Sequence, residues 1–225
     1  MATRFYWSSI AADLNLGGPV SGGGIWESSI GSIGATKKAR TVRGATSIAA
    51  VSVVVGNGTN PNDVLYWQGI SDPLAAQTIS GNISGVCCCR ENTSINTNAF
   101  TQLGAFVVDG SGNRVATLKG QQTTGGTEFN NPSANNRVFP RGGAAAVTSY
   151  ACAAGDRIVL EVGVRLETTR TGDTVTLYIG DAGGSDLPLG DGTSNNLTIN
   201  PWIEFANTLS FATLTPKRNR AMFLG

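Results

Sequence analysis

Three adjacent cysteines, Cys87, Cys88 and Cys89, are the residues whose type most readily suggests chemistry, and Cys152 is the fourth cysteine of the chain. In an extended strand, successive side chains point to opposite faces, so Cys87 and Cys89 would share one face and Cys88 would lie on the other. Such thiols do not converge on one ion, and the spacing lacks the C-x₂₋₄-C pairs of structural zinc sites. We expect reduced, metal-free thiols in a sheet, buried or half-buried. A disulfide to Cys152 and a metal or redox function are the alternatives.

Histidine is absent from the chain. Its absence removes the commonest general base and the commonest transition-metal ligand, and it argues against Ser-His-Asp, Cys-His and HExxH chemistry. A glycosidase needs two carboxyl groups about 5–10 Å apart, which Glu161 and Glu204 would provide only if their strands paired across a sheet face. The sequence therefore predicts a protein that is not an enzyme and that uses no cofactor.

An acidic, glycine-rich loop from Gly180 to Gly192 holds Asp181, Asp186 and Asp191. Oxygen-rich loops of this kind can bind Ca²⁺. The spacing differs from the EF-hand pattern, however, and Asp191 followed by glycine is a common turn signal. We expect a structural turn here, with cation binding as the alternative.

Tyr66, Trp67 and Trp202 are the aromatic residues that could form a platform for a carbohydrate, as exposed rings do in many jelly-roll binding modules. In alternating strands, however, a single tryptophan is more often part of the core. Glycan contact by these three residues is therefore an alternative to a plain packing role.

Charge is low and balanced, because the 225 residues include 16 Lys+Arg and 15 Asp+Glu, for a formal net charge of +1. This balance gives no general attraction to nucleic acid or to an anionic membrane. No stretch has the apolar length of a membrane span, and the first residues lack the apolar segment of a signal peptide. We expect neither a nucleic-acid nor a membrane partner, and a protein that folds in a cytoplasm with reduced thiols.

The elements that must position these residues are strands, because apolar residues recur in short runs and no helical period is sustained. The stretch Arg157–Glu167 shows the alternation best, with one apolar face from Ile158 to Leu166 and a more polar face that includes Glu161, as in a half-buried strand. By contrast, Gln121–Gly143 is expected to be a long polar loop region. The other expected strands are Arg4–Ser8, Thr46–Gly56, Val64–Ile70, Thr78–Glu91, Ala99–Asp109, Arg114–Gly120 and Thr174–Asp181.

Strands at this spacing predict an all-β fold, a jelly-roll-like antiparallel β-sandwich with an extended N-terminal arm and a C-terminal tail. Residues 1–215 would form a single domain, within which residues 9–38 are the Gly-rich arm. That arm is too long for an ordinary loop. Its Ile25 and Trp26 are expected to pack on this domain or on a neighbouring subunit.

The tail, residues 216–225, is expected to be a docking segment. Its cations could meet an acidic neighbour, and its apolar end could fill a pocket or add to a sheet edge. A disordered terminus is the alternative. The cations are Lys217, Arg218 and Arg220, and the apolar residues are Met222, Phe223 and Leu224.

Five stretches of turn and strand residues are YWQGISDPLAAQTISG (Tyr66–Gly81), FPRGG (Phe139–Gly143), AGDRIVLEVGVR (Ala154–Arg165), IGDAGGSDLPLGDG (Ile179–Gly192) and NPWIEFANTLSF (Asn200–Phe211). Together with the opening RFYWSS and the arm behind it, they resemble a family of virion proteins from tailed bacteriophages and prophages. The cysteine triplet and the basic tail are not part of that family's pattern, and no catalytic residues carry over from it.

The resemblance implies a non-enzymatic virion structural protein, a capsid decoration (cement) protein or a head-fibre component that packs on other virion subunits. The expected partners are other virion proteins (the major capsid protein, or neck and tail subunits) and further copies of this chain, with a trimer favoured. The protein would be located in the virion after assembly in the host cytoplasm. The alternative is a carbohydrate-binding jelly-roll module of a phage tail or fibre, with a receptor or glycan as its partner.

Overall fold

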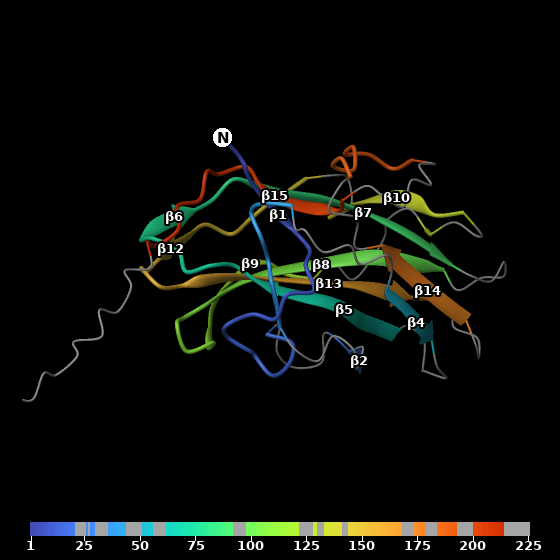
Figure 1. Cartoon of the computed structure of the whole chain (residues 1–225), viewed down its shortest axis with the longest axis horizontal. Coiled ribbons are helices and arrows are strands. Elements are labelled where there is room, and N and C mark those ends of the chain that lie inside the picture. The colour runs from blue at the N-terminus through green and yellow to red at the C-terminus, as the bar shows by residue number, and fades with distance from the viewer. Residues whose placement is uncertain are drawn as a thin grey trace, which may run out of the picture.

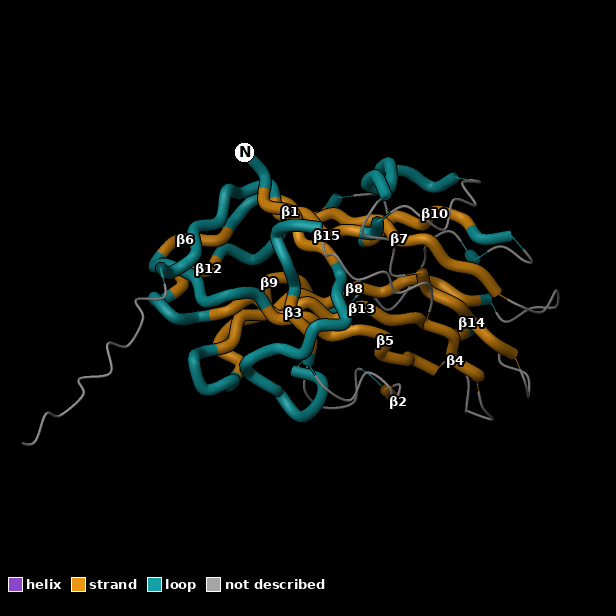
Figure 2. Tube along the Cα trace, in the orientation of Figure 1, coloured by secondary structure: helices purple, strands orange, loops and turns teal. Residues whose placement is uncertain are grey.

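The computed structural model describes residues 1–20, 26, 28–29, 36–43, 51–55, 62–91, 98–121, 128–129, 133–140, 144–167, 173–178, 184–192 and 200–213. These residues form strands, turns and loops without a helix (Figure 2). A helix able to cross a membrane is accordingly not found among them. Two large sheets are stacked as the two layers of a sandwich, elongated along the strands (Figure 1). The prediction of an all-β sandwich is confirmed.

The strands fall into two large sheets and one small sheet, and we call the large ones sheet A and sheet B. Sheet A contains β1 (Thr3–Tyr6), β4 (Val51–Val55), β7 (Asn82–Glu91), β10 (Asn135–Phe139), β11 (Ala145–Ala146), β14 (Asp173–Tyr178) and β15 (Trp202–Phe205). Sheet B contains β2 (Ser28–Ser29), β3 (Lys37–Lys38), β5 (Asn62–Ile70), β8 (Ala99–Val108), β9 (Arg114–Lys119) and β13 (Arg157–Leu166). The small sheet pairs β6 (Gln77–Ile79) with β12 (Tyr150–Cys152).

The order of the eight longest described strands is that of a jelly roll. Sheet A runs β4–β14–β7–β10 and sheet B runs β5–β13–β8–β9, with antiparallel pairing throughout. Along the chain, the strands alternate between the sheets except where the hairpin β8–β9 stays in sheet B. Two interlocked Greek keys produce this order. The remaining strands extend this framework: β1 pairs with β15, and β2 and β3 run parallel to β5.

The main core lies between the two sheets and is formed by the inward faces of both. The apolar face predicted for β13 is confirmed, because each of its five residues is at most 1% exposed and belongs to this core. Trp7 enters the same core from the N-terminal segment and stacks on Trp67 of β5, with 5.6 Å between the ring centroids. The five β13 residues are Ile158, Leu160, Val162, Val164 and Leu166.

Aromatic rings cover glycines at four places in these sheets. At Gly163 of β13, an added Cβ would lie 2.2 Å from the Val64 carbonyl oxygen and 2.3 Å from the Trp26 ring. These distances are far below contact, so each such glycine is needed for close packing rather than for a turn. The four pairs are Gly69 with Trp67, Gly85 with Phe139, Gly104 with Phe106, and Gly163 with Trp26.

Strand β10 corrects the prediction that Gln121–Gly143 is a loop region. It pairs with β7 over five residues and completes sheet A. Its sequence NNRVF hides the strand, because Asn135, Asn136 and Arg137 are polar and yet at most 3% exposed. Hydrogen bonds compensate for this burial: the Arg137 Nε donates to the Glu128 carbonyl at 2.7 Å, and its Nη1 donates to the Asn136 carbonyl at 2.8 Å.

Candidate functional site

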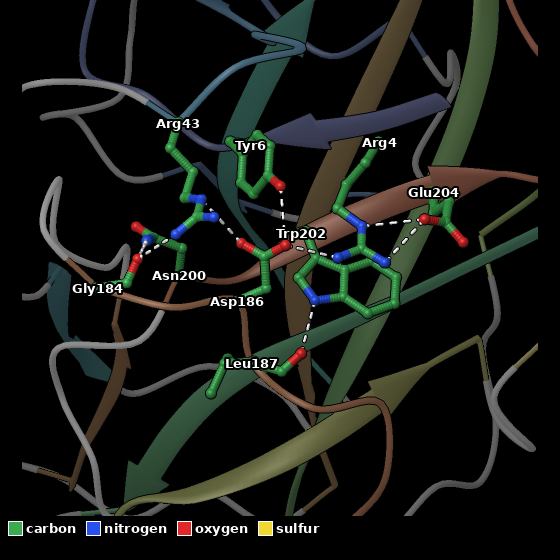
Figure 3. A network of polar contacts seen from close by, with 9 residues as sticks. All are labelled: Arg4, Tyr6, Arg43, Gly184, Asp186, Leu187, Asn200, Trp202 and Glu204. Atoms are coloured by element: carbon green, nitrogen blue, oxygen red, sulfur yellow. Dashed lines mark hydrogen bonds and ion pairs between the residues drawn. The ribbon is translucent and has the colours of Figure 1, made fainter. Parts of the chain in front are cut away.

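A charged cluster on the outer face of sheet A joins the first strand, the last strand and a long loop (Figure 3). Asp186 is at its centre: its Oδ2 lies 2.6 Å from Arg4 Nη1 and accepts the Tyr6 hydroxyl at 2.9 Å, and its Oδ1 lies 3.2 Å from Arg43 Nε. Arg4 also pairs with Glu204 at 2.8 Å. We call these five residues the Asp186 cluster. Both oxygens of Asp186 lie within ion-pair distance of an arginine, as in a structural charge cluster.

Hydrogen bonds hold the loop of residues 184–192 against sheet A. Leu187 donates its N–H to the Asn200 carbonyl at 2.9 Å and accepts the Trp202 indole N–H on its own carbonyl at 2.7 Å. The Gly184 carbonyl accepts from Arg43 Nη1 at 2.6 Å (Figure 3). The Leu187 side chain is buried in an outer apolar cluster with Trp202. The loop is therefore a fixed cover of this face.

Two of the three aspartates of the acidic loop have structural partners in the part of the chain that the structure describes. Asp186 forms the ion pairs above, and Asp191 accepts the Val138 N–H at 2.9 Å, which fixes the loop to β10. Asp181 lies outside the described residues. Partial burial raises the pKa of Tyr6, and the hydrogen bond to Asp186 raises it further. The Tyr6 hydroxyl therefore stays protonated and can donate.

A second polar site lies on the outer face of sheet B, under the N-terminal arm. We call residues 12–20 together with Trp26 the strap. Apolar strap residues pack against an outer apolar strip of sheet B, and Glu161, at the centre of β13, is 0% exposed beneath them. The strap contributes Ala12, Leu14, Leu16 and Val20, and the strip contains Ile70, Phe106, Val108 and Val159. The prediction that β13 is only half-buried is therefore wrong, because the strap covers its second face.

Three N–H groups converge on the Glu161 carboxylate. Its Oε1 accepts from the Val20 backbone at 2.5 Å and from Gln68 Nε2 at 2.9 Å, and its Oε2 accepts from the Trp26 indole at 2.8 Å. Gln68 is the β5 residue in register with Glu161. Gln68 also donates to the Gly18 carbonyl at 2.8 Å. The two side chains together fasten the strap to the sheet.

The two carboxylates considered for glycosidase chemistry do not meet. Glu161 lies on β13 in sheet B, and Glu204 lies on β15 in sheet A, where Arg4 binds it. Each faces the outer side of its own sheet, as their partners show. No acid–base pair of the required separation is formed between them.

The cysteine triplet lies in β7, the central strand of sheet A. Cys87 and Cys89 belong to the main core and Cys88 to the outer cluster, which confirms the predicted alternation. All three are 0% exposed, and the four thiols are free. Burial raises the pKa of Cys88 to about 12 and that of Cys152 to about 11, and it also raises the pKa of Cys89. Cys152 lies in β12, which pairs with β6 rather than with β7.

The aromatic residues considered for glycan contact are buried, which removes the basis for that expectation. Tyr66 and Trp67 are 2% exposed and Trp202 is 3% exposed. Tyr66 donates its hydroxyl to the Val175 carbonyl at 2.9 Å, and Trp67 donates its indole N–H to the Ser8 carbonyl at 3.0 Å. The guanidinium of Arg4 lies 3.9 Å from the Trp202 ring centroid and covers it. None of the three offers a ring face to a sugar.

Of the expected docking residues, the structure describes only Trp26. It is 8% exposed and packs on Gly163 of its own domain, one of the two outcomes that the sequence left open. Ile25 and the tail residues Lys217, Arg218, Arg220, Met222, Phe223 and Leu224 lie outside the described residues.

The residues that sequence reasoning missed are Arg4, Tyr6, Arg43 and Gln68. Alternation in RFYW could have placed Arg4 and Tyr6 on the outer face, opposite Phe5 and Trp7. Their partner Asp186 follows 182 and 180 residues later, so no local pattern connects them.

Comparisons with known proteins give little guidance. No family model matches the chain, and no curated protein matches it. A chain in a solved structure of infectious bursal disease virus, Gx strain, is similar at 11% identity and a TM-score of 0.24. The similarity covers 77% of this chain and 48% of that one, so this chain spans about half the length of the viral chain. Neither a family nor a function follows from a likeness of this size.

Proposed function

We propose that this chain is a non-enzymatic structural protein of a bacteriophage virion, and specifically a capsid decoration protein or head-fibre component that packs on other virion subunits. The observation that carries the proposal is the use of the charged residues. Glu161 and Glu204, which were considered for catalysis, and Asp186, which was considered for cation binding, all fasten segments of the chain to the sandwich. A jelly roll whose two outer faces are both covered by segments of its own chain is suited to a structural role.

The stretches that carry the phage resemblance support this proposal through their position. Residues within three of them, 66–81, 154–165 and 200–211, contact one another. Leu74 donates its N–H to the Asp156 carbonyl at 2.8 Å, and Ala75 donates to the Ser210 carbonyl at 2.9 Å. Leu74 also forms an isolated β-bridge with Phe211. These stretches therefore connect parts of the fold that are far apart in the sequence, which fits a structural rather than a catalytic role for the residues that carry the resemblance.

The proposed partners are other virion proteins, with the tail (residues 216–225) as the docking segment. Three cations followed by an apolar end suit an acidic neighbour with an adjoining apolar pocket. A homotrimer is the proposed oligomeric state. Gel filtration with light scattering of the isolated chain measures this state. A stable monomer would contradict the trimer and would mean that the tail is the only proposed means of attachment to the particle.

The proposal is tested by mass spectrometry of purified virions from a phage or prophage that carries this chain. We expect the protein in the particle at a fixed number of copies. A variant that ends at residue 215 should fold normally and be lost from the particle. A Lys119→Glu variant, changed at a cation of β9 in the sandwich, is the matched control and should be retained. Absence of the full chain from purified particles would refute the virion role.

A further inference from the structure

We propose that the strap (residues 12–20 with Trp26) is a releasable cover of sheet B, and that the buried Glu161 carboxylate is the latch that keeps it closed. In this proposal residues 12–20 and the Trp26 ring leave sheet B while the jelly roll beneath them stays folded. The inference stands independently of the virion role, since it concerns only contacts within one chain.

The strap lies on sheet B without being part of it. None of residues 12–20 takes part in the strand pairings of sheet B that the structure describes. The Val20 N–H and the Gly18 carbonyl bind the side chains of Glu161 and Gln68, and the Leu16 N–H binds the Thr36 hydroxyl. Opening the strap therefore breaks side-chain contacts and the backbone hydrogen bond from Ala12 to Thr36, and it leaves the ladders between β5, β13 and β8 complete.

Glu161 holds the strap closed through three hydrogen bonds. Its carboxyl group is held out of water, and it accepts from three neutral N–H groups. These hydrogen bonds offset the cost of taking the carboxyl group out of water, so the loss of one of them favours opening. The apolar strap residues Leu14, Leu16 and Val20 oppose opening, because they cover the strip that contains Phe106 and Val159.

The remaining contacts of the strap are at its margins. Asp13 pairs with Arg157 at 2.8 Å, but the Asp13 side chain is 52% exposed, so water and salt weaken this pair. The base of the strap is closed by the Ala12 N–H, which donates to the Thr36 carbonyl at 2.9 Å. Trp26 packs its ring on Gly163 and donates to Glu161. Glu161 is thus, with Gln68, one of the buried groups at which strap and sheet are joined.

Hydrogen–deuterium exchange of the full chain, followed by mass spectrometry of its peptides, tests the proposal. In the unaltered protein, we expect amides of residues 12–20 to exchange through openings that leave β8 and β13 protected. Glu161→Gln puts an amide donor where an acceptor is needed. It should speed exchange of the strap by at least about tenfold, because it leaves a buried N–H unpaired. Trp26→Phe, which keeps a ring but removes one donor, should act in the same direction with a smaller effect.

The control is Glu204→Gln, the same change at the partly exposed carboxylate of sheet A, which should leave strap exchange unaltered. The proposal is overturned if the strap exchanges together with β8 and β13 in the unaltered protein. It is equally overturned if Glu161→Gln leaves strap exchange unchanged, or if both Glu161→Gln and Trp26→Phe remove the protection of β8 and β13 along with that of the strap.

Discussion

At the scale of single residues, the role of each charged group described above depends on its partners rather than on its residue type. Glu161 and Asp186 are both carboxylates at the centre of a cluster, yet one has neutral donors and the other has two arginines. Glu161 is fully buried, whereas the Asp186 side chain is 24% exposed. The loss of one donor would therefore leave part of the buried Glu161 carboxyl group without a hydrogen bond. The Asp186 carboxylate also contacts solvent and two arginines, so the loss of one partner matters less.

The thiols give the first prediction at this scale. A buried thiol whose pKa lies above its unfolded value of about 8.5 stays protonated in the fold, and only the thiolate reacts with a disulfide reagent. All four cysteines are at most 5% exposed, so we expect them to be unreactive toward Ellman's reagent at about pH 8 in the folded protein and to react after unfolding in guanidinium. Rapid reaction of any thiol in the folded protein would contradict the burial of that residue.

The same pKa shifts fix the direction of the pH dependence. A group with a raised folded pKa contributes stability that is fully present below the unfolded pKa. This contribution is lost as the pH rises through the folded values, about 11 for Cys152 and about 12 for Cys88. Denaturation curves should therefore show a loss of stability above about pH 9, where unfolded thiols begin to ionise, and a Cys88→Ala variant should show less of it.

At the scale of elements, strand alternation determines which residues face the core. A glycine in a strand leaves room for an aromatic ring to pack directly on the backbone at that position. In β13 the ladder to β5 shifts register between Val162 and Gly163, and the Trp26 ring lies on that glycine. The Trp26 ring of the strap therefore packs on β13 at Gly163, two residues after Glu161.

Gly163→Ala tests this fit. The new methyl group would meet both the Trp26 ring and the backbone carbonyl of Val64, and the carbonyl cannot turn away without disturbing the ladder. We expect a loss of about 2–3 kcal/mol in the free energy of unfolding, as for an overpacked core, measured by urea denaturation. Gly120→Ala is the control, since an added Cβ there meets nothing within 4 Å. Equal stability of the two variants would show that Trp26 does not pack as described.

At the scale of the whole molecule, the two ends of the described chain complete the sandwich together. β1 pairs with β15, and the Leu209 N–H donates to the Thr3 hydroxyl at 2.7 Å. Phe5 of β1 is 0% exposed in the main core, and its ring meets that of Phe205 edge to face at 6.1 Å between centroids. The first residues are therefore part of the folding unit.

Phe5→Ala should destabilise the entire sandwich by about 3–5 kcal/mol, because a large aromatic side chain leaves a cavity in the core. Tyr6→Phe is the neighbouring control: it faces outward and loses only the hydrogen bond to Asp186, for a cost of about 1 kcal/mol. Thermal denaturation monitored by circular dichroism distinguishes them. A small effect of Phe5→Ala would mean that β1 can detach without unfolding the rest.

Properties that depend on neighbouring residues could be predicted from the amino-acid sequence. The period of two placed Cys87 and Cys89 opposite Cys88, and it placed the inner face of β13, because alternation is a property of any extended strand. The jelly-roll class followed from the spacing of the runs. The absence of histidine argues against several kinds of catalysis in any fold that the chain could adopt, because it is a property of composition alone.

Which segments cover which faces, by contrast, depends on the tertiary fold. β10 was hidden because Asn135 and Arg137 are polar and yet buried. Their side chains donate to the nearby backbone carbonyls of Ser133 and Glu128, and composition does not show that the fold will bury these groups. The outer face of β13 was expected at the surface, and it is buried because Val20, 141 residues earlier in the chain, lies on Glu161. Contacts between residues so far apart in the sequence depend on how the sheets stack. An alternating pattern shows that a strand has two different faces, but it does not show which segment packs against each face.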